Sequence, residues 1–369
     1  MIVAVIRVTL PSVAGRSYDV VCGTGLVDGV GRHLRSAGAR RGVVVCDAAL
    51  EATHGRATVE SLAAADVPCS MMLVPPGEAS KSVAAAARLW DAFAHDGVDR
   101  TTHVVAVGGG VVGDLTGFVA ATFMRGLPFW QVPTTLVAQV DSSVGGKTGV
   151  NLEAGKNLVG AFWQPLGVFA DVDTLASLPR REFVSGLAEV VKYGMILDAG
   201  FFQWLEDRAD DVLARDPAAV THVVTRSVEL KARVVEADER ETSGARAALN
   251  YGHTFGHAYE AVAGYGRLLH GEAVSIGMAR AARLAEALGR IPEDIVTRQD
   301  RLLRRLGLPT SPTVLQPTPG PAELLEVMTR DKKTVGGVPR FVLPDRIGSV
   351  ALVDGVPSHL VLRILALAE

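Results

Sequence analysis

The sequence predicts an α/β N-terminal domain with a mostly parallel sheet, followed by a mostly α-helical C-terminal domain. The chain has 369 residues, whereas a single hydrophobic core rarely grows beyond about 250 to 300 residues. Up to about residue 178, short β-branched runs alternate with alanine-rich stretches, and long amphipathic stretches replace them afterwards. We therefore expect two domains, residues 1–177 and 178–369, with an active site in the cleft between them.

The α/β half begins with an apolar run, MIVAVIRVTL, that reads as a first strand. Arg7 interrupts this run, and no basic leader precedes a cleavage site of small residues. The alanine-rich stretch 84–94 has helical spacing. Further strands are expected at residues 42–46, 71–74, 103–107 and 128–132.

The second half carries amphipathic patterns that predict helices at residues 181–193, 218–237, 252–263 and 272–288. Five prolines within residues 309–321 predict a linker or surface loop. A late apolar run, residues 340–343, is expected to form a small strand that returns near the cleft.

Composition limits the classes of function. A net charge of -3 gives no field that would gather nucleic acid, so a small-molecule partner is expected. No apolar stretch approaches the roughly 20 residues that span a bilayer, so no membrane contact is expected. Cys22, Cys46 and Cys69 are odd in number and form no CxxC pair, which suits reduced thiols in a cytoplasmic protein.

A glycine-rich loop follows the strand expected at residues 103–107. The run GGGVVGD, residues 108–114, matches G-x-G-x-x-G at the start of a helix. There, glycines let the backbone approach a pyrophosphate at the helix N-terminus. No acidic residue lies about 20 positions later, where the usual fingerprint has one for the ribose. The loop therefore fits dinucleotide binding, and it also fits an ordinary strand-to-helix turn.

Polar residues interrupt the small apolar residues of the stretch 131–151 and continue in Lys156 and Asn157. Charged side chains in such surroundings are usually paired, exposed or directed to a polar cavity. A ligand-facing loop explains them better than a solvated surface loop does. The polar residues within the stretch are Thr134, Thr135, Asp141, Ser142, Lys147 and Asn151.

Histidines and a carboxylate in the second half predict a metal site. Glu189 and Lys192 share one face of a helix, and His253 and His257 lie one turn apart, with His270 shortly after them. Three protein ligands and an open position are typical of catalytic zinc. An ion pair and satisfied core histidines are the alternative interpretation, and spacing alone does not select which two histidines bind.

Five basic residues complete a candidate site for an anionic substrate: Arg125, Lys231, Arg246, Lys332 and Lys333. Arginine matches phosphate and carboxylate groups bidentately, whereas lysine supplies a point charge. Each residue alone reads as a solvated surface charge, so the hypothesis depends on their occurring together.

These motifs, in this order, resemble the 3-dehydroquinate synthases of the sugar-phosphate cyclase family over nearly the whole chain. The matching blocks are PGEASK (76–81), GGGVVGD (108–114), DSSVGGKTGVN (141–151), GKN (155–157), LAEVVK (187–192), NYGHTFGHA (250–258), LHGEAV (269–274) and DKK (331–333). The resemblance implies a Rossmann-like NAD-binding domain, a helical domain that binds Zn²⁺ or Co²⁺, and a homodimer.

By matching positions, the resemblance implies residue roles. The metal ligands are Glu189, His253 and His270. The catalytic residues are Asp141, Lys147, Lys192, Asn250 and His257, of which His257 is the candidate for proton transfer. The NAD-contacting residues are Asp47, Glu78, Lys81, Gly109, Gly110, Asp114, Thr134, Thr135, Lys156, Ser177 and Leu178. The other substrate contacts are Arg125, Asn157, Lys231, Arg246 and either Lys332 or Lys333.

The sequence departs from the family pattern at one point. Where the family often has Asp-x-Asn after its second strand, this chain has Asp47-Ala48-Ala49. One hydrogen bond to the cofactor is therefore expected to be missing.

The implied reaction converts 3-deoxy-D-arabino-heptulosonate 7-phosphate into 3-dehydroquinate and phosphate, with NAD reduced and reoxidised within each turnover. The alternatives are an aminodehydroquinate synthase, whose substrate keeps the carboxylate, and a cyclase for a neutral sugar phosphate. Outside the family, a metal-dependent polyol dehydrogenase shares the two-domain plan but would release NADH.

Overall fold

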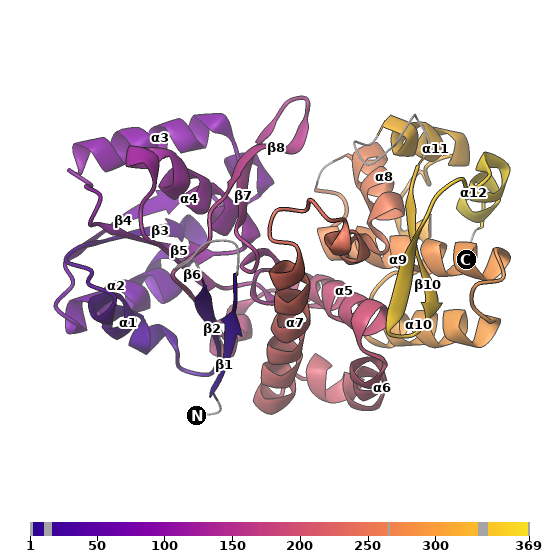
Figure 1. The fold of residues 1–369 in the computed structure, drawn as a ribbon, viewed down its shortest axis with the longest axis horizontal. Helices are drawn as coiled ribbons and strands as arrows, with labels where there is room; N and C mark the ends of the chain where they lie inside the picture. Colours follow the sequence, from indigo (N-terminus) through magenta and orange to yellow (C-terminus); the bar gives the residue numbers. More distant parts are fainter. Residues whose placement is uncertain (1–2, 11–16, 265, 331–338, 368–369) are drawn as a thin grey trace. The chain divides into compact units, whose positions relative to one another are not determined.

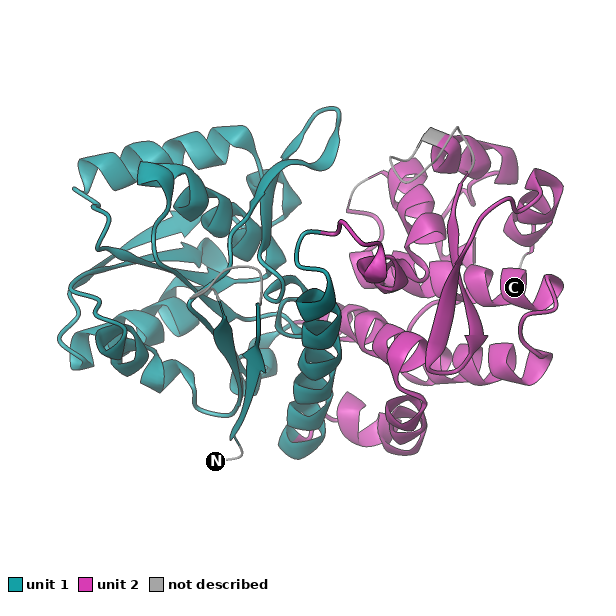
Figure 2. Ribbon diagram, in the orientation of Figure 1, with its two compact units in different colours: residues 1–178, 217–240 teal, residues 179–216, 241–369 magenta. Residues whose placement is uncertain are grey.

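The computed structural model describes residues 3–10, 17–264, 266–330 and 339–367. Most of its helices and strands are labelled in Figure 1. The chain divides into two compact units, residues 1–178 with 217–240 and residues 179–216 with 241–369 (Figure 2). Within the described ranges, no helix is long and apolar enough to cross a membrane.

Unit 1 is built on a seven-stranded sheet with the order β1-β2-β9-β6-β5-β3-β4. Only the β1–β2 pair is antiparallel, and every other neighbouring pair is parallel. The expected mostly parallel sheet is therefore confirmed. The strands are β1 (Val3–Val8), β2 (Tyr18–Gly23), β3 (Gly42–Asp47), β4 (Cys69–Val74), β5 (His103–Gly108), β6 (Phe129–Pro133) and β9 (Gly167–Asp171).

Helices cover both faces of this sheet because successive strand residues point to opposite sides. In β3, Val43 and Val45 join the core beneath α3 and α4, whereas Val44 and Cys46 join the core beneath α1 and α2. Figure 1 shows these two helical layers. The four helices are α1 (Val30–Ser36), α2 (Arg56–Ala64), α3 (Val83–His95) and α4 (Gly110–Thr122).

Part of the expected ligand-facing loop is regular structure. Residues 131–133 belong to β6, a helical turn spans Ala138–Ser142, and β7 (Lys147–Leu152) pairs with β8 (Gly155–Phe162) as an antiparallel hairpin. The small residues that suggested a loop serve close pairing in this hairpin. A Cβ on Gly149 would lie 2.6 Å from the Val159 carbonyl oxygen.

The helix α7 (Pro217–Ala237) belongs to unit 1, although the sequence pattern places it with the later helices. Its Lys231 Nζ donates to the Asp141 carbonyl oxygen at 2.6 Å, and its Glu236 accepts from the Thr9 backbone N–H at 2.7 Å. Unit 1 contains residues 217–240 as well as 1–178, so this helix interrupts the range 178–369 that was expected to form one domain.

Unit 2 is mostly helical and is organised around α9, which is buried over most of its length. One antiparallel hairpin, β10–β11, accompanies the helices and includes the late strand expected from the sequence. The elements are α5 (Arg180–Leu197), α6 (Ala199–Leu213), α8 (His253–Ala263), α9 (His270–Ala287), α10 (Glu293–Arg305), α11 (Pro321–Arg330), α12 (Ser358–Leu365), β10 (Phe341–Arg346) and β11 (Ser349–Val353).

Candidate functional site

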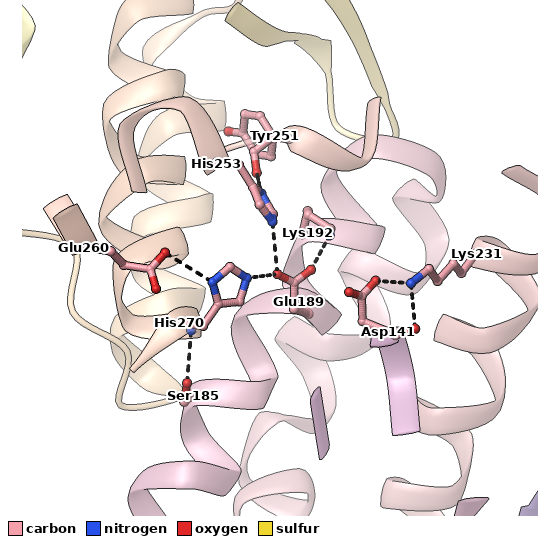
Figure 3. Close-up of polar contacts among 10 residues, drawn as sticks. Asp141, Ser185, Glu189, Lys192, Lys231, Tyr251, His253, Glu260 and His270 are labelled. Atoms are coloured by element: carbon pink, nitrogen blue, oxygen red, sulfur yellow. Dashed lines mark hydrogen bonds and ion pairs between the residues drawn. The ribbon is translucent and has the colours of Figure 1, made fainter. Parts of the chain in front are cut away.

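Three helices of unit 2 bring Glu189, His253 and His270 together (Figure 3). Glu189 lies within α5, whereas the two histidines are the first residues of α8 and α9. Glu189 Oε1 lies 3.5 Å from His253 Nε2 and 3.4 Å from His270 Nε2. The three ligand atoms all lie within 4.8 Å of one another, a spacing that a single metal ion can bridge.

Glycines allow these helices to approach closely. Gly271 follows His270, and a Cβ there would lie 1.8 Å from the carbonyl oxygen of Ser185, one turn before Glu189. On the same helix, a Cβ on Gly277 would lie 2.0 Å from the Gly252 carbonyl oxygen, directly before α8. Helix α9 thus contacts α5 and the start of α8 at backbone distance, and this packing places the three ligands.

The second ring nitrogen of each histidine faces an acceptor. His253 Nδ1 lies 3.1 Å from the Tyr251 carbonyl oxygen, and His270 Nδ1 lies 3.4 Å from Glu260 Oε2. A proton on Nδ1 leaves the Nε2 lone pair available to a metal, which is how zinc-binding histidines are usually held. One carboxylate and two imidazoles presented in this way fit Zn²⁺ or Co²⁺.

Lys192 lies one turn after Glu189 and forms an ion pair with its Oε2. Both residues are almost completely buried, at 1% and 0% exposure. Burial lowers the pKa of His253 well below its ordinary value, against the opposing attraction of Glu189. For His270, burial also acts to lower the pKa, but the hydrogen bonds to Glu189 and Glu260 outweigh it and raise the pKa to about 10.

His257 is part of this cluster but is not one of the three grouped ligands. Its ring centroid lies 5.4 Å from that of His253 and 6.4 Å from that of His270. Arg246 is 2% exposed, with its Nε 3.8 Å from Glu241 Oε1, and Asn250 is half-buried in the turn that precedes α8. The expected contacts Lys332 and Lys333 lie outside the described residues.

In unit 1, the glycine-rich loop lies where the strand order reverses. Strands β3 and β5 are neighbours, and the chain leaves them toward opposite faces of the sheet. Ligands in open α/β sheets bind at such switch points, at the carboxyl ends of the strands. Asp47 ends β3 with its carboxylate accepting from the Ala49 backbone N–H at 2.9 Å, and Gly108 ends β5.

The loop after β5, called the cradle below, leads directly into α4. Gly109 precedes the first turn of α4, and a Cβ on Gly110 would lie 2.9 Å from Ser142 Oγ. Thr134 donates its backbone N–H to Gly108, and Thr135 Oγ1 accepts from the next helical turn. The first N–H groups of a helix have no partners within the helix, so a helix start after a glycine-rich loop suits a dinucleotide diphosphate.

Two polar pairs flank the cradle. Lys81 Nζ lies 2.5 Å from Asp114 Oδ2, and burial raises the pKa of Asp114 although Lys81 acts to lower it. Glu78 accepts from the Asn151 side chain at 2.7 Å, and Asn151 in turn accepts from the Asn157 backbone N–H at 3.0 Å. The Asn151 side chain therefore joins Glu78, an expected NAD contact, to Asn157, an expected substrate contact.

The remaining expected residues of unit 1 differ in exposure. Asp141 Oδ1 lies 2.7 Å from Lys231 Nζ, whose side chain is almost fully buried. Ser177 Oγ is 3.1 Å from His54 Nε2, and Leu178 follows it at the end of this unit. Lys147 is exposed at the start of β7, Lys156 is half-buried in β8, and Arg125 is exposed with a positive φ of 67°.

Sequence analysis did not find Glu260 or the glycines at the helix contacts. Glu260 lies seven residues after His253, so it faces the same side of α8 as His253 and His257. The signal in the sequence that could have indicated Glu260 was a carboxylate on the same helical face as two histidines. It also fits an ordinary amphipathic helix.

Comparisons with known proteins match most of the chain. Residues 71–185 match the family described as 3-dehydroquinate synthase N-terminal, and residues 186–334 match 3-dehydroquinate synthase C-terminal. A 3-dehydroquinate synthase of Rhodopirellula baltica is 49% identical over 361 residues, covering 96% of this chain and 95% of the relative.

Solved structures of sugar-phosphate cyclases share the fold over nearly the whole chain. A 2-deoxy-scyllo-inosose synthase complexed with carbaglucose-6-phosphate, NAD⁺ and Co²⁺ has a TM-score of 0.87 at 26% identity, covering 98% of this chain and 99% of that chain. A 2-epi-5-epi-valiolone synthase from Streptomyces hygroscopicus with NAD⁺ and Zn²⁺ has a TM-score of 0.86 at 29% identity, covering 97% of each.

Proposed function

Because the chain belongs to the 3-dehydroquinate synthase family, we propose that it converts 3-deoxy-D-arabino-heptulosonate 7-phosphate into 3-dehydroquinate and phosphate. The observation that carries this proposal is the convergence of Glu189, His253 and His270 beside the buried Lys192. NAD is reduced and reoxidised within each turnover, so it acts as a cofactor. The reaction belongs to the shikimate pathway of aromatic amino acid biosynthesis.

The metal would be held by Glu189, His253 and His270, with Zn²⁺ or Co²⁺ as the ion. The two solved cyclases carry Co²⁺ or Zn²⁺, and the donor set of this chain suits both. When bound, such an ion lowers the pKa of a coordinated hydroxyl and so favours its oxidation.

NAD would be bound by the expected residues at the β3–β5 switch point of unit 1. Backbone N–H groups at the start of α4 would hold the diphosphate. Lys81 would balance the charge of Asp114 beside the cofactor. Because Ala49 offers no polar side chain, this side of the cofactor would be held by Asp47 and the backbone.

The substrate carries a phosphate and a carboxylate, so basic residues would bind it. Lys147, Lys231, Arg246, one of Lys332 and Lys333, and Arg125 would supply positive charge, and Asp141, Asn157 and Asn250 would bind hydroxyl groups. The main contribution of these residues is to position the reacting carbons and to stabilise developing charge.

Two residues beside the metal ligands, His257 and Lys192, would act directly on the substrate. His257 adjoins both histidine ligands, so it would transfer a proton to or from a substrate oxygen. Lys192 pairs with the Glu189 oxygen that does not face the histidines, and its positive charge would hold an anionic group of the substrate. Oxidation acidifies the neighbouring C–H, and the departing phosphate would accept that proton.

The experiment that tests the function follows phosphate, 3-dehydroquinate and NADH together. Purified protein is incubated with NAD, Zn²⁺ and 3-deoxy-D-arabino-heptulosonate 7-phosphate, and parallel reactions contain sedoheptulose 7-phosphate or glycerol. Phosphate and 3-dehydroquinate in equal amounts, without net NADH, are expected only with the first substrate. Phosphate release from sedoheptulose 7-phosphate alone would assign a different cyclase, and NADH accumulating with glycerol would assign a dehydrogenase.

The proposal includes a cytoplasmic homodimer. The free cysteines Cys22, Cys46 and Cys69 suit a reducing compartment. Among the exposed apolar side chains of unit 1, three lie on the β7–β8 hairpin and one lies next to Arg125: Leu152, Leu158, Val159 and Met124. A second copy covering them would remove this apolar surface from water. Sedimentation equilibrium is expected to give twice the monomer mass, and a monomer at micromolar concentration would contradict this part.

A further inference from the structure

The two histidines of the metal cluster differ in the group that faces Nδ1. For His253 the acceptor is a neutral backbone carbonyl, that of Tyr251, at 3.1 Å. For His270 it is a carboxylate, Glu260 Oε2, at 3.4 Å. The Glu260 side chain is only 11% exposed, so water screens its interaction with the ring weakly.

The periodicity of α8 produces this contact. His253, His257 and Glu260 follow one another at i, i+4 and i+7, which places them on one face of the helix over two turns. That face lies against α9, because Gly256 of α8 is so close that a Cβ there would lie 3.0 Å from the Ala273 carbonyl oxygen. One helix therefore provides a metal-facing histidine and also the carboxylate that meets the histidine of its neighbour.

Glu260 contacts His270 on the side of the ring opposite the cluster. Its oxygen faces Nδ1, whereas Nε2 of the same ring faces Glu189 Oε1 at 3.4 Å (Figure 3). Among the described residues, the grouped ligand atoms are those of Glu189, His253 and His270, without Glu260. Any effect of Glu260 on a metal is therefore transmitted through His270.

From this geometry we infer that Glu260 is a positioning residue that orients His270 and strengthens its bond to the metal. The carboxylate accepts a hydrogen bond from Nδ1–H, which fixes the tautomer and directs the Nε2 lone pair toward the ion. It also makes the imidazole a better donor, and removal of such partners typically weakens metal binding about 10–100-fold. The inference rests on the proposed metal site and assigns to Glu260 a role that is separate from ligation.

Two variants test the inference, with a third as a control. Glu260→Gln keeps the size of the side chain and one acceptor oxygen but removes the charge, whereas Glu260→Ala removes both. Glu286→Gln removes a carboxylate from α9 that pairs with Arg283, away from the cluster. Each metal-free protein is titrated with Zn²⁺ against a chromogenic chelator, and the Co²⁺ absorption spectrum reports the coordination geometry.

We expect Glu260→Ala to bind Zn²⁺ about 10–100-fold more weakly than the unaltered protein, Glu260→Gln to fall between them, and Glu286→Gln to match the unaltered protein. The dissociation constant of each variant for NAD and the circular dichroism spectrum of each metal-free protein are expected to stay unchanged. Zn²⁺ affinities of both Glu260 variants within twofold of the unaltered protein would overturn the inference.

Three further outcomes of the Zn²⁺ titrations also decide between the interpretations. If Glu260→Ala does not fold, the near-isosteric glutamine variant gives the answer. A metal-free Glu260→Gln protein that has lost secondary structure, as seen by circular dichroism, together with its Zn²⁺ affinity would overturn the inference in favour of a structural role. Failure of the unaltered protein to bind Zn²⁺ would reject the proposed metal site itself, an outcome distinct from equal binding by all variants.

Discussion

Lys192 Nζ and Glu189 Oε2 form an ion pair on α5 from which water is almost completely excluded. The pair lies one helical turn apart, and the other carboxylate oxygen of Glu189 faces the two histidines. The Glu189 carboxylate therefore joins the positive charge of Lys192 to the metal-binding cluster. Lys192 and the cluster each depend on this carboxylate for charge balance.

Removal of one partner of this ion pair should cost more than removal of both. In the metal-free protein, Glu189→Gln leaves Lys192 buried without a counter-charge, a change that typically lowers the free energy of unfolding by about 3–5 kcal/mol. The double variant Glu189→Gln/Lys192→Met removes the uncompensated charge and should regain much of that loss. Urea denaturation measures both, and strictly additive effects of the two substitutions would contradict the coupling.

Gly271→Ala should damage the metal site through packing alone. Its Cβ would meet the Ser185 backbone at 1.8 Å, so α9 must move away from α5. We expect a loss of about 1–3 kcal/mol or more in stability, together with weaker Zn²⁺ binding measured by chelator competition. Gly320→Ala is the control because its Cβ would have no neighbour within 4 Å. Normal Zn²⁺ affinity in Gly271→Ala would show that this contact does not place His270.

Lys81→Met should weaken NAD binding and leave metal binding unchanged. Without Lys81, the Asp114 carboxylate would stand unbalanced beside the diphosphate cradle. We expect at least a tenfold rise in the dissociation constant for NAD, or about 1.4 kcal/mol, measured by calorimetric titration. Arg32→Met, on the exposed surface of α1, should behave like the unaltered protein. Equal NAD affinity in all three proteins would place the cofactor elsewhere.

The buried thiols should be unreactive in the folded protein. Burial raises the pKa of the Cys22 and Cys46 thiols to about 12, so almost none of the reactive thiolate is present at pH 8. A thiol-reactive disulfide reagent should label neither of these residues in native protein at pH 8, although half-buried Cys69 can react slowly. All three should react in denaturant. Rapid labelling of Cys22 or Cys46 before unfolding would contradict this burial.

Local elements of the fold follow from the sequence better than their grouping does. The strand β5 and the helix α5 contain the residues expected of them, because β-branched runs and helical periodicity are local signals. The sequence does not reveal that α7 belongs to unit 1, since its amphipathic pattern resembles those of the later helices. The contacts of Lys231 with Asp141 that tie it there join residues far apart in the chain.

The candidate site shows the same limit. Spacing identified His253, His257 and His270 as a group but left open which two of them bind a metal. In the structure the ligand atoms of His253 and His270 group with that of Glu189, and His257 is not in this group. This grouping depends on how the helices pack, which spacing does not specify. Glu260 was missed for this reason, since its importance arises only when α8 packs on α9.

The most direct test of the account limits NAD to one equivalent per enzyme and supplies a hundredfold excess of 3-deoxy-D-arabino-heptulosonate 7-phosphate with Zn²⁺. The account predicts that 3-dehydroquinate and phosphate rise together far beyond the amount of NAD, while no NADH accumulates. Product formation that stops at one equivalent of NAD, with NADH appearing in the same amount, would contradict the claim that this chain recycles its cofactor as a 3-dehydroquinate synthase.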